Sequence, residues 1–203
     1  MQTVIFDMAG VVLKEGAVIP FSLIPFVKEQ VSYETLIERY QLAKVGEISD
    51  ADFWKGVSDW KETENKFLDS LEINNDFHML KKLKPKYKLS LLSNFVGSWA
   101  DYLIEKYDFN SLFDSIVISA NCKMKKPDSK IYKYALSQLN AKAEETFFVD
   151  DQKRNLMAAH KLGMKTVFFK TERDKWFNSE INFKADLEAK SLTEVAECLM
   201  KET

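Results

Sequence analysis

The sequence predicts an α/β protein with a parallel sheet and a helical segment inserted after the first strand. Three observations support this prediction. An apolar run, Val4–Phe6, begins three residues into the chain and ends in a carboxylate, Asp7. From residue 87 to residue 169, short apolar runs alternate with helical patterns, which is typical of a parallel sheet covered on both faces. Between these parts, residues 14–82 show helical periodicity and no convincing β run.

Size and composition fit one substantial core domain with a smaller appendage. The chain has 203 residues, of which 46% are hydrophobic, and a net charge of −2, which gives no reason to expect nucleic acid or a membrane as partner. No apolar run approaches the roughly 18 residues of a membrane span, and no signal-peptide pattern opens the chain, so we expect a soluble, cytoplasmic protein. Cys122 and Cys198 are expected to be reduced thiols.

The inserted segment is expected to contain four helices. Ser32 is a suitable N-cap for the first helix and Ser49 for the second, with Gly46 interrupting the pattern between them. The first predicted helix covers residues 32–44 and the third covers residues 63–71. The second is predicted to begin at residue 49 and the fourth at residue 74 or 75. The aromatic side chains of this segment are expected to form its core rather than to contact a ligand; they are Phe53, Trp54 and Trp60.

The remainder of the chain alternates between strand and helix patterns. Strands are predicted at residues 87–93, 115–119, 146–150 and 165–169. Helices are predicted at residues 98–107, 128–140, 152–162 and 191–200.

Polar residues stand where three of the predicted strands end and before one of the helices. In open α/β sheets, ligand sites are built at the carboxyl ends of the strands. Two adjacent buried acids, Asp150 and Asp151, would repel each other without a cation, which favours a metal site. The four stretches, in chain order, contain Asp7; Ser93 and Asn94; Lys126 and Pro127; and Asp150, Asp151 and Asn155.

Together and in this order, the four stretches resemble the four motifs of the haloacid dehalogenase-like hydrolase superfamily, in its phosphatase-type branch with a small helical cap. The resemblance runs from Val4 to Phe169 and leaves out the helical insert. It implies a Rossmann-like core made of residues 1–14 and 83–203, with strand order 5-4-1-2-3 and the site at the carboxyl ends of the strands. It also implies that residues 15–82 form a helical cap that closes over this site.

The resemblance implies that the chain handles a phosphoryl group. Asp7 would be the nucleophile that forms an aspartyl-phosphate. Ser93 would bind the phosphoryl group through its hydroxyl, with the backbone N–H of Asn94 beside it. Lys126 would pair with both the nucleophile and the phosphoryl oxygens, a role that suits a compact ammonium charge.

The resemblance also implies a magnesium ion. Mg²⁺ prefers oxygen ligands, often one or two carboxylates together with waters and substrate phosphate. Asp7, Asp151 and the backbone carbonyl of Ala9 would coordinate the ion. Asp150 and Asn155 would hold the waters bound to it.

One residue departs from the pattern of the family. Most phosphatases of this superfamily carry a second aspartate two residues after the nucleophile, where it acts as general acid and base, but this chain has Ala9. The expected function is a slow, magnesium-dependent hydrolysis of small phosphomonoesters, including sugar phosphates, by a monomer or homodimer. Three alternatives stay open: a 2-haloacid dehalogenase, a non-catalytic protein that binds a phosphorylated ligand, and an engineered Ala9 in an otherwise active enzyme.

Overall fold

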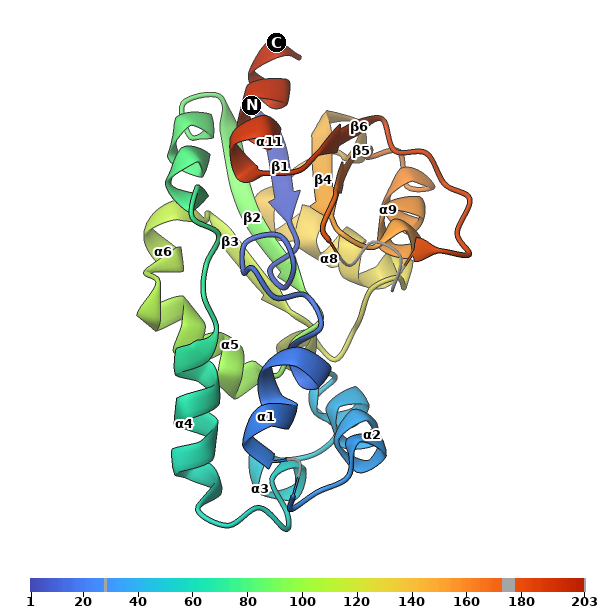
Figure 1. Ribbon diagram of the computed structural model, residues 1–203. Coiled ribbons are helices and arrows are strands. Elements are labelled where there is room, and N and C mark those ends of the chain that lie inside the picture. Colours follow the sequence, from blue (N-terminus) through green and yellow to red (C-terminus); the bar gives the residue numbers. More distant parts are fainter. Residues whose placement is uncertain (28, 173–177, 203) are drawn as a thin grey trace.

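The computed structural model describes residues 1–27, 29–172 and 178–202. These residues form a sheet of six parallel strands in the order β3-β2-β1-β4-β5-β6 (Figure 1). The predicted α/β fold and the order of the first five strands are confirmed. The strands are β1 (Gln2–Phe6), β2 (Tyr87–Ser93), β3 (Ser115–Ile118), β4 (Thr146–Asp150), β5 (Lys165–Phe169) and β6 (Leu187–Ala189).

Along each strand, successive side chains point to opposite faces of the sheet. Both faces are therefore apolar, and helices cover both of them. Val4 and Phe6 of β1 belong to one apolar cluster, while Ile5 belongs to another on the opposite face. The first cluster is completed by η2 (Phe77–Leu83), α5 (Gly97–Lys106), α6 (Phe109–Leu112) and α11 (Leu192–Lys201). The second is completed by α8 (Ser129–Leu139) and α9 (Lys153–His160).

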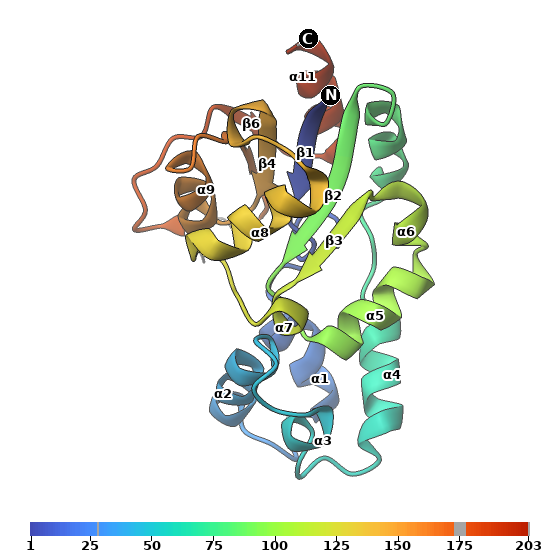
Figure 2. The ribbon, with the colours of Figure 1, turned by 180° about the vertical axis from the view of Figure 1, so that it is seen from behind.

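The helical segment lies beyond the carboxyl ends of the strands, and both chain termini lie at the opposite end of the molecule (Figures 1 and 2). The two predicted caps are confirmed. The Ser32 hydroxyl accepts a hydrogen bond from the Thr35 N–H, and Ser49 forms a capping box with Asp52. The segment contains η1 (Ile19–Leu23), α1 (Ile24–Val27), α2 (Tyr33–Ala43), α3 (Asp50–Phe53) and α4 (Trp60–Ser70).

Aromatic side chains join this segment to the sheet domain. Trp99 of α5 packs edge-on against Phe53 and Phe67, with ring centroids 5.0 and 4.9 Å apart. Glu64 of α4 accepts a hydrogen bond from each indole N–H of Trp54 (2.8 Å) and Trp99 (2.7 Å). Phe53 and Trp54 are buried, as predicted for the core of the segment. The helical segment and the sheet domain therefore share one continuous apolar cluster.

Residues 76–83 pack against the sheet domain. The Asp76 carboxylate accepts hydrogen bonds from the N–H and hydroxyl of Thr193 at the start of α11, at 2.7 and 2.9 Å. Leu80 and Leu83 of η2 are fully buried in the cluster that covers the sheet. The division between cap and core at residue 82 stays a prediction.

Five short helices and the sixth strand were not predicted. They are η1, α1, α6, α7 (Ser119–Cys122), η3 (Ala143–Glu145) and β6. Neither Cys122 nor Cys198 forms a disulfide. Among the residues that the structure describes, no helix combines the length and apolar character needed to cross a bilayer.

Candidate active site

A cavity of about 180 Å³ opens at the carboxyl ends of β1, β2 and β4, between the sheet and the helices η1 and α2. Its floor is polar and one wall is apolar. Six of the predicted site residues line it: Asp7, Ala9, Ser93, Asn94, Lys126 and Asn155. The other two, Asp150 and Asp151, are buried next to this floor, and their carboxylates converge with that of Asp7.

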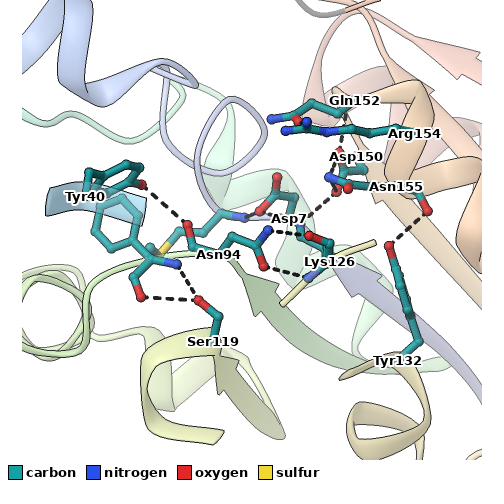
Figure 3. A network of polar contacts seen from close by, with 12 residues as sticks. Asp7, Tyr40, Asn94, Ser119, Lys126, Tyr132, Asp150, Gln152, Arg154 and Asn155 are labelled. Atoms are coloured by element: carbon teal, nitrogen blue, oxygen red, sulfur yellow. Dashed lines mark hydrogen bonds and ion pairs between the residues drawn. The ribbon is translucent and has the colours of Figure 1, made fainter. Parts of the chain in front are cut away.

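Lys126 forms a buried ion-pair triad with two acids (Figure 3). Its ammonium lies 2.9 Å from Oδ1 of Asp7 and 2.7 Å from Oδ2 of Asp150. Burial alone would lower the pKa of Lys126, but the charges of Asp150 and Asp7 raise it above its usual value. Burial raises the pKa of Asp7 to about 7, although Lys126 acts in the opposite direction. The lysine therefore stays charged and holds the Asp7 carboxylate in place.

The Asn94 side chain holds the loop that carries Lys126. Its amide Nδ2 donates to the Lys126 carbonyl at 2.9 Å, and the Lys126 N–H donates to Asn94 Oδ1 at 2.8 Å. The next peptide bond, Lys126–Pro127, is cis. Sequence reasoning assigned Asn94 a role only through its backbone N–H, so this side-chain contact between β2 and the loop is an addition.

Asp150 is saturated by donors from the chain itself. Besides Lys126, its carboxylate accepts hydrogen bonds from the Gln152 N–H (2.8 Å) and from Asn155 Nδ2 (3.1 Å to each oxygen). Tyr132 of α8 in turn donates to the Asn155 carbonyl at 3.0 Å. Asp150 therefore fixes the positions of Lys126 and Asn155.

Asp151 and the loop after β1 approach each other closely. Gly10 has a φ of +88°, and a Cβ there would lie 2.6 Å from Oδ2 of Asp151, so glycine is needed for both conformation and space. A Cβ on Gly16 would lie 2.9 Å from the same oxygen and 3.6 Å from the Ala9 carbonyl oxygen. The Asp151 carboxylate and the Ala9 carbonyl therefore border the same small space.

Three carboxylates meet at this point with one lysine among them. Oxygens of Asp7, Asp150 and Asp151 all lie within 4.8 Å of one another. Burial, and then the charges of Asp150 and Asp7, raise the pKa of Asp151 well above its usual value. This concentration of buried negative charge is costly without a cation. The donor set of carboxylate and carbonyl oxygens fits a hard divalent cation.

Three buried polar atoms of this site have no hydrogen-bond partner within the described part of the chain. They are Ser93 Oγ, Asp151 Oδ1 and Asn155 Oδ1. Buried polar atoms are nearly always satisfied, so each of these requires a partner beyond those that the described residues supply. A phosphoryl group beside Ser93 and a hydrated cation beside Asp151 and Asn155 would satisfy them.

The cavity is also lined by polar residues that the sequence analysis did not identify as part of the site. Among them are Tyr40 and Lys44 at the end of α2, and Gln152 and Arg154 at the start of α9. A signal existed for the second pair, since both lie between Asp151 and Asn155 in the sequence.

The end of α2 is fixed against the sheet domain. Ser119, at the start of α7, accepts a hydrogen bond from the Phe95 N–H at 3.0 Å and donates one to the Lys44 carbonyl. Gly46 follows with a φ of +69°, and a Cβ there would lie 2.6 Å from the Ala120 carbonyl oxygen. These contacts place the side chain of Lys44 at the cavity.

We expect magnesium to stabilise the folded protein through Asp151. A ligand at about 100 times its dissociation constant adds about 2.7 kcal/mol, which corresponds to a rise in Tm of about 5–10 °C for a chain of this size. Asp151→Asn should reduce this rise to about 1 °C or less, because it removes one carboxylate ligand. The exposed Asp101→Asn variant is the matched control. An unchanged magnesium-induced rise in Asp151→Asn, measured by thermal unfolding, would contradict the predicted role of Asp151 as a magnesium ligand.

A protein-family model described as haloacid dehalogenase-like hydrolase matches residues 4–169 of the chain. The matched range begins in β1 and ends with β5, so it contains all four stretches that build the cavity floor.

Curated relatives match smaller parts of the chain. A glyceraldehyde 3-phosphate phosphatase from Pyrococcus furiosus is 30% identical over 127 residues, which are 61% of this chain and 52% of that relative. The drimenol cyclase drtB from Aspergillus calidoustus is 34% identical over 106 residues, 50% of this chain and 20% of that protein. The chain thus spans about half, or less, of the length of these two relatives.

Solved structures share the fold over nearly the whole chain. A HAD phosphatase from Thermococcus onnurineus superposes with a TM-score of 0.75 at 19% identity, covering 98% of both chains. A HAD-family enzyme from Bacteroides thetaiotaomicron, in complex with magnesium and inorganic phosphate, gives 0.70 at 23% identity, covering 85% of this chain and 96% of that one. An L-2-haloacid dehalogenase from Xanthobacter autotrophicus gives 0.70 at 14% identity, covering 100% of both chains.

Proposed function

Since the chain belongs to the haloacid dehalogenase-like hydrolase family, we propose that it is a magnesium-dependent phosphatase of small phosphorylated metabolites that uses Asp7 as nucleophile. The observation that carries this proposal is the set of buried, unsatisfied atoms around the Asp7–Lys126 pair. Ser93 Oγ offers a donor to a phosphoryl oxygen, while Asp151 Oδ1 offers an acceptor to a cation. Phosphatases among the relatives support the same chemistry.

The proposed reaction has two displacements at phosphorus. In the first, a carboxylate oxygen of Asp7 bonds to phosphorus and the ester oxygen leaves with its electron pair. In the second, water attacks the aspartyl-phosphate, which releases inorganic phosphate and restores the carboxylate. Lys126 orients Asp7 and neutralises charge on the phosphoryl oxygens, and Ser93 donates a hydrogen bond to one of them.

The residues that would hold magnesium are Asp7, Asp151 and the carbonyl of Ala9. When bound, the ion would supply positive charge that offsets the negative charge of the phosphoryl group and the surrounding carboxylates. The Asp150 carboxylate accepts hydrogen bonds from the Asn155 amide and so holds Asn155 beside the proposed magnesium site.

Ala9 lines the cavity, and its methyl group cannot transfer a proton. A positioned acid or base typically contributes about 10²–10⁴-fold to such a step. Esters whose leaving groups need little protonation should therefore be the better substrates. This class includes aryl phosphates and sugar 1-phosphates.

A substrate panel tests this expectation. Phosphate release from p-nitrophenyl phosphate and sugar 1-phosphates should exceed release from sugar 6-phosphates by about 10²-fold or more in kcat, because the 6-phosphates are alkyl esters that need an acid. Inorganic phosphate is measured for each ester at matched enzyme and magnesium concentrations. Equal rates on 1- and 6-phosphates would show that another group supplies the proton.

Two other functions make different predictions in the same panel. A 2-haloacid dehalogenase would release chloride from 2-chloropropionate and no phosphate from any ester. The similarity to the L-2-haloacid dehalogenase concerns the fold alone. The adjacent acids Asp150 and Asp151 favour a bound cation, which fits the magnesium-dependent phosphatase better than the dehalogenase. A non-catalytic protein would bind phosphorylated ligands in a magnesium-dependent manner without releasing phosphate.

A further inference from the structure

Two cationic side chains line the cavity without taking part in the proposed phosphoryl chemistry. Lys44 caps the end of α2 in the helical segment, and Arg154 is the second residue of α9 in the sheet domain. The phosphoryl group at Asp7 is already served by Lys126 and Ser93. Lys44 and Arg154 therefore place extra positive charge in the cavity.

Lys44 is half-buried and has no carboxylate partner among the described residues. Its ammonium lies 5.4 Å from the centre of the Tyr40 ring. Burial, followed by the positive charges of Lys125 and Arg154, lowers the pKa of Lys44 to about 8. The Lys44 ammonium therefore lacks a neighbouring negative charge among the described residues, and a bound anion would raise its pKa and favour its charged form.

Arg154 also lacks an acidic partner in the described part of the chain. Its Nε donates to the side-chain oxygen of Gln152 at 2.9 Å, and the two side chains lie together beside the site of Asp7 and Asp150 (Figure 3). Both of those acids are held by Lys126. The remaining N–H groups of the guanidinium are suited to a carboxylate or a phosphate, which they can bind in a bidentate manner.

One wall of the cavity is apolar. It is formed by residues at the start of η1 and in α2, namely Val18, Ile19, Pro20 and Ile37. Such a wall suits the organic part of a small ligand, with polar groups at its ends.

We propose that Lys44 and Arg154 form a second anion site, and that the substrate carries a carboxylate or a second phosphate in addition to the phosphoryl group at Asp7. This inference rests on the proposed function, because that function places the phosphoryl group. The two side chains come from different parts of the molecule, Lys44 from the helical segment and Arg154 from the sheet domain. They are specificity-determining residues, and the phosphoryl transfer itself remains with Asp7.

The test compares aryl phosphates that differ in one charge. The probes are 3- and 4-carboxyphenyl phosphate, the corresponding carboxamides, and 1,3- and 1,4-phenylene bisphosphate. All have aryl leaving groups, so the missing acid at residue 9 affects them similarly. Wild-type protein should favour at least one charged probe over its carboxamide by about tenfold or more in kcat/KM, the value expected for a charge-assisted contact. Whether the carboxylate or the bisphosphate is preferred identifies the second group.

Variants show whether the preference comes from these two side chains. In a Lys44→Met and Arg154→Met double variant, the ratio of charged to neutral probe should fall to within about twofold of one, because methionine keeps the apolar stem and removes the charge. Lys125→Met removes a nearby charge outside this cavity and should retain the ratio. Lys44→Gln and Arg154→Gln give the same comparison if the double variant fails to fold.

The two proposals fail in different ways. Equal rates on charged and neutral probes in the wild type, or a preference that the double variant keeps, would overturn the second site. An equal loss in Lys125→Met would assign the preference to the general field of the surface and would also overturn it. If no probe releases phosphate, the proposed function fails. Calorimetric binding of the same probes then decides: tighter binding of a charged probe that requires Lys44 and Arg154 supports the site, and equal binding overturns it.

Discussion

Asp7→Asn is expected to abolish phosphate release, with a loss of at least about 10³-fold in kcat, because an amide cannot form the aspartyl-phosphate. Asp7 directly follows β1, and its Oδ1 is held by Lys126 at 2.9 Å and by the Met8 N–H at 2.6 Å. Asparagine has the same shape, so the cavity should keep its form. The loss should therefore appear in kcat while the fold is retained.

Two measurements separate chemistry from folding in this variant. Circular dichroism and thermal unfolding should show a native fold, since Lys126 keeps its ion pair with Asp150. Asp101→Asn makes the same change at an exposed position of α5 and should retain activity within about twofold, as surface substitutions usually do. Turnover by folded Asp7→Asn at the wild-type rate would rule out Asp7 as the nucleophile.

Ala9→Asp is expected to accelerate the hydrolysis of alkyl phosphates, by up to about 10²–10⁴-fold in kcat, because it supplies the absent proton donor. Ala9 is only partly buried and lines the cavity, so a carboxylate built on it has access to the leaving group. Its backbone carbonyl, which borders the space beside Asp151, does not depend on the side chain.

The size of this gain should depend on the leaving group. p-Nitrophenyl phosphate needs little protonation and should gain much less than a sugar 6-phosphate in the same assay. Ala9→Asn adds a side chain of the same size that cannot transfer a proton, so it separates proton transfer from steric effects. No gain in Ala9→Asp, or an equal gain in Ala9→Asn, would show that the cavity is organised around a different proton path.

The strands and most helices were predictable because their patterns are local. β2, β4 and β5 occupy the predicted ranges 87–93, 146–150 and 165–169, where apolar runs end in turn-forming or charged residues. β6 contains three residues, Leu-Glu-Ala, and forms through pairing with β5 at the edge of the sheet. A run this short has no periodicity of its own, so tertiary pairing decides its conformation.

The members of the candidate site were predictable, but their mutual contacts were not. Asp7 follows β1 and Ser93 is the last residue of β2, and parallel strands bring such positions to one edge of the sheet. The contact of the Asn94 amide with the Lys126 backbone joins segments 32 residues apart in sequence. No pattern within either segment specifies it. The same is true of Lys44 and Arg154, which meet at one cavity only because α2 folds over the carboxyl ends of the strands.

The most direct test of the proposed phosphatase is phosphate release from p-nitrophenyl phosphate, measured with magnesium and again with EDTA. We predict release with magnesium and loss of at least about 10²-fold with EDTA, because Lys126 alone then offsets the negative charge of Asp7, Asp150 and Asp151. Restoring magnesium should restore the rate. Release that EDTA leaves unchanged, or no release from this activated ester under either condition, would contradict a magnesium-dependent phosphatase.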